Sequence, residues 1–293
     1  MTTVLVCGAT GNTGSEVLRQ LRGEDVTLRA LTRSKESAER LSAEGVQAFV
    51  GNLEEVAGLG PALDGVDVVY VANPASPELP ALEGALAAAA RDAGVGHLVK
   101  LSVIGAAADS PLSFAELHFH AEELIRQSGI GWTMLRPNGF MQNTLAWSAQ
   151  IPGGVIYGPV MDARWSIIDV RDIGAVGAAA ILDAAAHAGK TYELTGPEDS
   201  SPREQVAIVA DLLGVPLEAQ EVTIDQAKAT MLSMGWPEWN VERMGELFEI
   251  YAEGIAQTIS GDVEVVTGRP ARTYGEFAAD HLDTFRAGGQ ADE

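Results

Sequence analysis

Short apolar runs alternate with amphipathic segments through the first half of the chain. The amphipathic segments predict helices at Ser15–Arg22, Ser34–Ser42, Leu53–Leu63 (broken), Pro80–Ala93 and Phe114–Ser128. The apolar runs predict strands at Thr3–Cys7, Val26–Thr32, Gln47–Val50, Val66–Val71, His97–Ser102 and Trp132–Leu135. Strands that are apolar throughout and alternate with helices form parallel sheets with helices on both faces. The expected fold is therefore an α/β, doubly wound parallel sheet.

Beyond Pro137 the pattern is less regular and predicts a smaller second unit. Strands are expected at Ser166–Val170 and Thr191–Leu194, and helices at Asp172–Ala186, Pro202–Leu213, Val241–Ile259 and Thr273–Phe285. Ser201 and Glu204 have the spacing of a capping box. We expect residues 1–137 to form the sheet domain, with 155–195 returning to it. Residues 138–154 and 196–286 are expected to form a discontinuous substrate lobe, followed by a disordered tail at 287–293.

A glycine-rich turn, GATGNTG at residues 8–14, joins the first strand to the first helix. Gly8 allows a tight turn, Gly11 lets backbone amides approach a pyrophosphate, and Gly14 lets the helix pack against the strand. The helix N-terminus adds free amides and a partial positive charge. The turn predicts a Rossmann-type dinucleotide site, although an ordinary glycine-rich turn is the alternative. The expected contacts in this turn are Gly8, Thr10, Gly11, Asn12, Thr13 and Gly14.

Arg33 ends the second predicted strand, where NAD enzymes usually carry an acid for the ribose 2′-hydroxyl. Its guanidinium suits a 2′-phosphate, with Lys35 and Ser34 beside it. NADP(H) is therefore the expected cofactor, with NAD(H) as the alternative, unless Arg33 is simply a solvated side chain. Further cofactor contacts are expected near the carboxyl ends of the later strands. They are Asn52, Leu53 and Asn73.

Composition excludes several classes of function. The 293 residues include 41 acids and 19 bases, a net charge of −22, which disfavours nucleic acid and anionic membranes as partners. No apolar run reaches the roughly 18 residues of a membrane span, and no signal peptide begins the sequence. Cys7 is the single cysteine and the histidines are scattered, so neither a disulfide nor a metal site is expected. These features favour a cytoplasmic protein.

The chain resembles the NmrA-like branch of the atypical short-chain dehydrogenase/reductases. The resemblance rests on the glycine turn, Arg33, Leu101-Ser102 and the segment WTMLRPNGFMQN at 132–143, and it covers about residues 2–175 well. This family includes NADPH-dependent quinone reductases and redox-sensing regulators that bind the dinucleotide without turning it over. The resemblance implies that the loop Arg136–Phe140 closes over the nicotinamide and that Ser102 is the strand-five serine of the catalytic site. It therefore also implies cofactor contacts at Ser102, Pro137, Asn138 and Phe140.

The Tyr-x-x-x-Lys pair of typical short-chain dehydrogenases is missing, because no tyrosine has lysine four residues later. His118 and Glu122 occupy that spacing instead. Reduction of a quinone tolerates the loss, since its product is a phenolate with a pKa near ~10. His118, with an ordinary pKa near ~6.5, is the candidate proton donor. The alternatives are that His118 lines a helix face and that Glu122 is a solvated acid rather than an orienter of His118.

On the substrate side, Phe140, Met141, Trp147 and Trp165 are expected to line an apolar slot, unless they are core residues. Trp236 and Trp239 are candidates for a lid. The expected function is an NADPH-dependent reductase of a quinone or similar flat aromatic acceptor, with an aromatic polyketide intermediate in a hydroxylation or tailoring step as one candidate. The alternative is an NAD(P)-sensing regulator acting through a protein partner. An enzyme predicts an open apolar cavity beside the nicotinamide and a sensor predicts a plugged one. Either form is expected to be a monomer or a homodimer.

Overall fold

The computed structural model describes residues 1–288 and contains one sheet of seven parallel strands. The strand order is β3-β2-β1-β4-β5-β6-β8, so the direction of winding reverses between β1 and β4. The strands are β1 (Thr2–Cys7), β2 (Val26–Thr32), β3 (Gln47–Val50), β4 (Val68–Val71), β5 (His97–Leu101), β6 (Gly131–Pro137) and β8 (Lys190–Leu194). This arrangement confirms the Rossmann-type doubly wound sheet.

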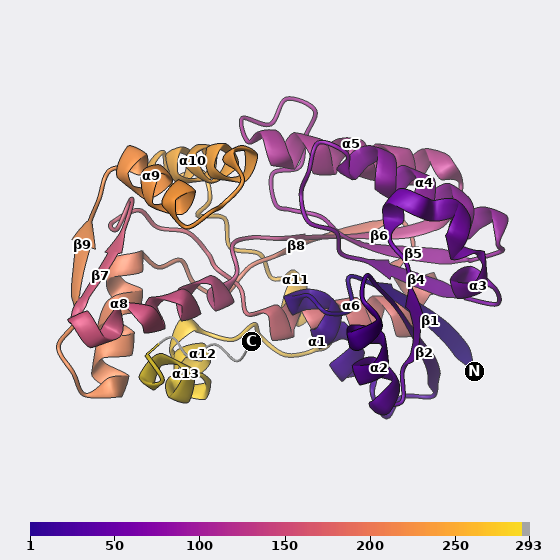
Figure 1. Cartoon of the computed structure of the whole chain (residues 1–293), viewed down its shortest axis with the longest axis horizontal. Coiled ribbons are helices and arrows are strands. Elements are labelled where there is room, and N and C mark those ends of the chain that lie inside the picture. Colours follow the sequence, from indigo (N-terminus) through magenta and orange to yellow (C-terminus); the bar gives the residue numbers. More distant parts are fainter. Residues whose placement is uncertain (289–293) are drawn as a thin grey trace.

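Helices cover both faces of the sheet (Figure 1). One face carries α1 (Asn12–Leu21), α2 (Lys35–Ala43) and α6 (Val170–Leu182), and α7 (Ala184–His187) leads from α6 to β8. The other face carries the 3-10 helix η1 (Leu53–Leu59), α3 (Gly60–Leu63), α4 (Leu79–Asp92) and α5 (Ser113–Ser128). The side chains of β1 alternate between two cores: Val4 and Val6 enter the first, and Leu5 and Cys7 the second. Burial on both faces explains why the central strands are apolar at most positions.

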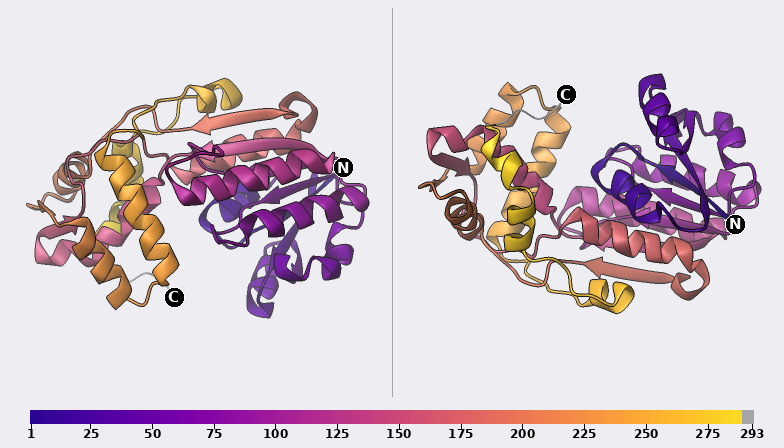
Figure 2. Two further views of the ribbon diagram at one scale, coloured as in Figure 1. Left: turned by 90° about the horizontal axis from the view of Figure 1, so that it is seen from above. Right: turned by 90° about the horizontal axis from the view of Figure 1, so that it is seen from below.

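A smaller lobe lies beyond the carboxyl ends of the strands (Figures 1 and 2). It has its own apolar clusters, one of which contains Met141, Tyr274, Phe277 and Phe285. Its elements are η2 (Met141–Ala149), η3 (Ile151–Gly153), β7 (Val155–Gly158), α8 (Pro202–Leu213), β9 (Glu218–Glu221), α9 (Ile224–Ser233), α10 (Glu238–Ala252), α12 (Tyr274–Asp280) and α13 (Leu282–Arg286). Between α10 and α12 the chain returns to the sheet, where α11 (Asp262–Thr267) packs against α6 and buries Val263.

The lobe differs from the sequence expectation in its strands. The strand predicted at Ser166–Val170 is absent, and that segment makes a single bridge, from Ile168 to Phe140, before Asp169 caps α6. Residues 155–158, which the sequence places in the sheet domain, form β7 and pair with β9 instead. The helix predicted through Ile259 ends at Ala252. The last predicted helix is two short ones that meet at His281.

The capping box at the start of α8 is present: the Ser201 hydroxyl accepts the Glu204 amide, and the Glu204 carboxylate accepts the Ser201 amide. The exact division into domain and lobe stays a prediction. Of the expected tail at 287–293, residues 289–293 lie outside the described residues. Within residues 1–288, no helix is both long enough and apolar enough to cross a membrane.

Candidate active site

A cleft of about 440 Å³ opens at the carboxyl ends of β1 and β4, where the winding of the sheet reverses. This is the place where doubly wound sheets bind their ligands. Most of the expected cofactor contacts line it. They are Gly8, Thr10, Gly11, Asn12, Thr13, Arg33, Asn52, Leu53, Asn73 and Phe140.

The glycine turn is held by close backbone packing. Gly8 has a φ of +86°, and a Cβ atom there would lie well under 3.0 Å from the Ala72 carbonyl oxygen. A Cβ atom on Gly14 would lie equally close to the Gly8 carbonyl oxygen. Gly14 therefore sits beneath the turn rather than in the cleft. The first turn of α1 has no acidic residue and no side-chain cap, so its amides remain available to an anion.

Arg33 lies in the cleft wall as an exposed side chain, and no ion pair involves it within residues 1–288. The two expected helpers do not join it. Lys35 begins α2 outside the cleft, and the Ser34 hydroxyl accepts the Ser37 amide as the cap of that helix. The Asn52 side-chain oxygen likewise accepts the Glu55 amide, which leaves its NH₂ group for a ligand. Arg33 is thus the one cation among the described residues that line the cleft, and its contact with a 2′-phosphate stays a prediction.

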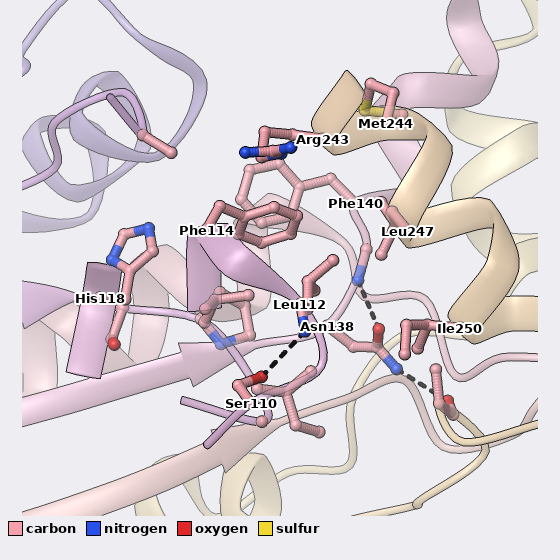
Figure 3. A pocket seen from close by; sticks show the side chains of 18 of the residues that line it. Ser110, Leu112, Phe114, His118, Asn138, Phe140, Arg243, Met244, Leu247 and Ile250 are labelled. Atoms are coloured by element: carbon pink, nitrogen blue, oxygen red, sulfur yellow. Dashed lines mark hydrogen bonds between the residues drawn. The ribbon is translucent and has the colours of Figure 1, made fainter. Parts of the chain in front are cut away.

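A larger cavity of about 560 Å³ adjoins the cleft and shares Asn73, Pro74, Leu101 and Phe140 with it. Its lining comes from strand ends, the start of α5 and one face of α10 (Figure 3). Ser102, Pro137 and Asn138, expected as cofactor contacts, line this cavity rather than the cleft. The apolar lining includes Leu112, Phe114, Trp236, Trp239, Met244, Leu247, Ile250 and Tyr251. The cavity is therefore open and largely apolar.

The expected substrate residues are only partly in place. Phe140 lines the cavity, but Met141 is 1% exposed in the lobe core and Trp147 packs in the same clusters. Trp165 lies behind the wall, with its ring stacked on Tyr251 at a centroid distance of 4.1 Å. The slot proposed for Met141, Trp147 and Trp165 is therefore wrong. The chain after β6 turns Met141 and Trp147 into the lobe core, and the buried ring of Tyr251 lines the cavity in front of Trp165.

Asn138 fixes the loop after β6. Its side-chain NH₂ donates to Ser166 Oγ and to the Ala256 carbonyl, each at 3.0 Å. Its Oδ1 accepts the Gly139 amide at 2.8 Å (Figure 3). The side-chain amide is fully used within the protein. Asn138 therefore positions the loop. Its predicted contact with the cofactor would have to come from backbone atoms and stays a prediction.

His118 on α5 lines the cavity and is nearly buried, at 7% exposure. Its Nδ1 lies 3.1 Å from Nζ of Lys100, a fully buried side chain on β5. Burial, with the charge of Lys100, lowers the pKa of His118 well below its ordinary value. The expectation of an imidazole poised near ~6.5 is therefore wrong, and His118 is neutral at pH 7. Lys100 Nζ also lies 2.5 Å from Glu83 Oε2, another fully buried group.

Ser102 and Glu122 belong to a separate network. The Ser102 hydroxyl donates to Glu122 Oε1 at 2.6 Å, and Arg136 and Arg126 also donate to that carboxylate. Burial opposes ionisation, but the hydrogen bonds from Arg136 and Ser102 hold the pKa of Glu122 below its ordinary value. Glu122 is therefore a buried, paired acid rather than a solvated one, and its partners do not include His118. Because Ser102 donates its proton to Glu122, it is poorly placed to donate one to a substrate.

Comparison with known proteins decides the family. The model of the NmrA-like family matches residues 1–275. The chain belongs to the NmrA-like family. An NAD(P)H azoreductase from Xenophilus azovorans is 39% identical over 285 residues, covering 97% of this chain and 99% of that protein. A (4-alkanoyl-5-oxo-2,5-dihydrofuran-3-yl)methyl phosphate reductase from Streptomyces griseus is 35% identical over 286 residues, covering 96% and 99%. The solved NADPH complex of a quinone oxidoreductase from Escherichia coli is 26% identical, with a TM-score of 0.84 over 96% of this chain and 99% of that one.

Two features of this NmrA-like site escaped the sequence analysis. Lys100 was read as part of an apolar strand, although a lysine inside such a run is itself a signal of a buried, paired charge. Of α10 the sequence indicated only Trp239, as a lid candidate, and this side chain lines the cavity. The positions of α10 that line the cavity recur at helical spacing, and they are 239, 240, 243, 244, 247, 250 and 251. No group of three or more metal-ligating side chains gathers in the part of the chain that the structure describes.

Proposed function

We propose that this protein delivers a hydride from NADPH to a flat conjugated acceptor such as a quinone. Relatives that match nearly its whole length are NAD(P)H-dependent reductases, and the chain is accordingly an NAD(P)H-dependent oxidoreductase that uses NADP(H). The observation that carries the acceptor proposal is the meeting of the two cavities at Asn73, Pro74, Leu101 and Phe140. A nicotinamide entering from the cleft would there face a molecule held in the apolar cavity.

The cavity explains how such a site works without the Tyr/Lys pair. Apolar and aromatic walls exclude water and hold a flat ring system face-on, so the protein contributes orientation while the cofactor contributes the hydride. Hydride transfer to a quinone leaves a phenolate, whose pKa near ~10 removes the need for a strong acid. An azo group is a second conjugated acceptor of suitable shape, in keeping with the named azoreductase relative.

The volume of about 560 Å³ lies within the range of ~300–1,000 Å³ typical of sites for drug-sized ligands. Acceptors of two to four fused rings therefore belong to the proposed range, and an aromatic polyketide intermediate in a tailoring step is one of them. The open cavity favours an enzyme over a regulator, because a sensor has no need of an apolar chamber next to its nicotinamide. A monomeric or homodimeric state remains a prediction.

The direct test follows NADPH absorbance with purified protein and a panel of neutral quinones and azo dyes, beside binding titrations of NADPH and NADH. We expect oxidation that requires both protein and acceptor. Tight NADPH binding without turnover on any acceptor would instead support the regulator. Absence of binding to either nucleotide would contradict the assignment of the cleft.

The position of Arg243 in the cavity wall predicts that the site prefers anionic acceptors to neutral ones. It is the one arginine among the described residues that line the larger cavity, and its Nε is buried without a hydrogen-bond partner there. One of its terminal nitrogens pairs with Glu246 at 2.7 Å, which leaves part of the guanidinium free. A hydrogen bond to a charged group contributes about 1.5–3 kcal/mol, less where water has access. Arg243→Met should therefore raise KM for a naphthoquinone sulfonate about tenfold and leave KM for menadione unchanged.

The matched control is Arg203→Met, which removes an arginine on α8 that pairs with Asp162 away from both cavities. Steady-state kinetics with the sulfonated and neutral quinones measures the effect. An equal change in KM for both quinones in Arg243→Met would assign Arg243 to packing rather than to recognition of an anion.

A further inference from the structure

We propose that Lys100 supplies the proton that completes acceptor reduction, passing it to the acceptor through His118. This inference rests on the proposed function, since it concerns the step that follows hydride transfer. His118 is the group that touches the acceptor, and Lys100 acts behind it. The proposal joins three observations: a buried cation behind the cavity wall, a histidine in that wall, and one ring nitrogen left for the bound molecule.

Lys100 lies in the protein interior, where an ammonium group costs free energy unless an opposite charge or hydrogen-bond acceptors compensate it. Its side chain is 0% exposed, between the sheet and the helices α4 and α5. Nζ contacts Glu83 Oε2 at 2.5 Å, His118 Nδ1 at 3.1 Å and the Leu101 carbonyl at 3.2 Å. Glu83 is fully buried, whereas Leu101 and His118 line the cavity, and of these two only His118 has a titratable side chain. Lys100 is therefore connected to the cavity without being open to it.

The contact fixes the state of the imidazole. An ammonium group only donates, so Nδ1 of His118 must accept and the ring proton must lie on Nε2. Within residues 1–288, Nε2 has no hydrogen-bond partner, while the ring lies at the end of the cavity opposite Leu247 and Ile250 (Figure 3). Nε2–H is thus the donor that a bound acceptor would meet. The low pKa of the imidazole agrees with a neutral ring between an ammonium and a ligand.

None of the other charged and titratable groups near Lys100 competes with it as a proton donor to His118. Glu83 from α4 is its counter-ion, and burial raises the pKa of that carboxyl. Glu122 from α5 is held by Arg136 and Arg126. Cys7 from β1 stays a neutral thiol, because burial raises its pKa to about 12. No second cation from these elements contacts His118, so Lys100 is the proton source that the geometry provides.

The step balances as follows. The hydride moves two electrons and one hydrogen from C4 of NADPH to the quinone, giving NADP⁺ and a hydroquinone anion. The phenolate oxygen takes the proton from His118 Nε2 as Nδ1 takes one from Lys100 Nζ, which leaves the imidazole neutral and the amine uncharged. After the hydroquinone leaves, one proton from solvent returns through the open cavity along the same path. The net reaction consumes NADPH, quinone and one proton.

The experiment compares His118→Phe, Lys100→Met and the double variant with menadione as acceptor. Each single change should lower kcat about tenfold, at the modest end of general-acid effects because a phenolate is easily protonated. NADPH affinity should stay unchanged. If Lys100 acts only through His118, the double variant should be no slower than either single one. A structural role of Lys100 would instead give losses that multiply.

Two further variants separate proton supply from folding and positioning. Lys100→Met combined with Glu83→Gln removes the buried pair together and avoids an unpaired buried acid, so it keeps the test available if the single variant fails to fold. Lys100→Arg keeps a charged hydrogen-bond donor beside His118, but this donor cannot release a proton, since arginine does not deprotonate in proteins. We expect both to be slow with menadione. Full activity of Lys100→Arg would show that Lys100 only positions His118, and would overturn the proposal.

The wild-type protein separates failure of this inference from failure of the proposed function. No acceptor-dependent oxidation of NADPH by the wild-type chain would overturn the proposed function and the relay with it. Wild-type turnover that the Lys100→Met/Glu83→Gln variant retains would overturn the relay alone. A solvent isotope effect on kcat in the wild type that disappears in His118→Phe would support the transfer from Nε2.

Discussion

Replacing Gly14 with alanine should abolish tight NADPH binding and destabilise the fold. A Cβ atom there would lie under 3.0 Å from two backbone atoms of Gly8, which cannot swing away as a side chain would. Relief requires shifting α1 away from the turn, and overpacking of this kind costs about 1–3 kcal/mol. The shift also moves the amides that face the pyrophosphate. Losing two charge-assisted hydrogen bonds of ~1.5–3 kcal/mol each predicts at least ~100-fold weaker binding.

Titration of NADPH and denaturant unfolding measure the two effects. The matched control is Gly58→Ala in η1, where an added Cβ meets no atom within 4 Å. That variant should bind NADPH like the wild type. Unchanged affinity in Gly14→Ala would mean that the turn does not hold the pyrophosphate.

Replacing Arg33 with alanine should weaken NADPH binding about 10- to 100-fold and leave NADH binding nearly unchanged. The 2′-phosphate distinguishes the two nucleotides, and Arg33 is the cation in the cleft wall that can meet it with two parallel hydrogen bonds. Such bonds contribute about 1.5–3 kcal/mol each when desolvated, and less at an exposed site such as this one. Selectivity between the cofactors should therefore fall by the same factor.

Lys35→Ala is the control, because that side chain lies outside the cleft although it is close to Arg33 in sequence. Parallel titrations of both nucleotides should show no change in this variant. Equal losses for NADPH and NADH in Arg33→Ala would contradict the role of Arg33 at the 2′-phosphate.

The sheet could be predicted from the sequence because its strands carry their own signal. A strand buried on both faces is apolar at most positions, and every strand of the large sheet lies within two residues of its expected bounds. The small sheet gives no such signal. β9 reads Glu-Ala-Gln-Glu and is mostly exposed, so only its pairing with β7 makes it a strand. Tertiary pairing overrides local propensity there.

The same contrast holds for the site. The glycine turn was predictable because its chemistry is local: seven consecutive residues bend the chain and start a helix. The larger cavity could not be predicted, because Phe140 lines it together with residues of α10 that follow Phe140 by about a hundred positions in the chain. Met141 was wrongly placed in the cavity because it adjoins Phe140 in sequence, whereas its side chain is buried in the lobe core. The contact between Lys100 and His118 likewise depends on how α5 packs on β5.

Each cavity draws on a different part of the chain. Every residue that lines the cleft, the proposed cofactor site, lies between Cys7 and Phe140. Much of the larger cavity, the proposed acceptor site, comes instead from α10 and the loop after it. Substitutions on α10 can therefore alter the range of acceptors without touching a cofactor contact. In evolutionary terms, the protein can acquire new substrates by exchanging one helix while it inherits its source of reducing equivalents unchanged. A library restricted to the cavity-facing positions of α10 is the natural route to dyes or quinones of new shape.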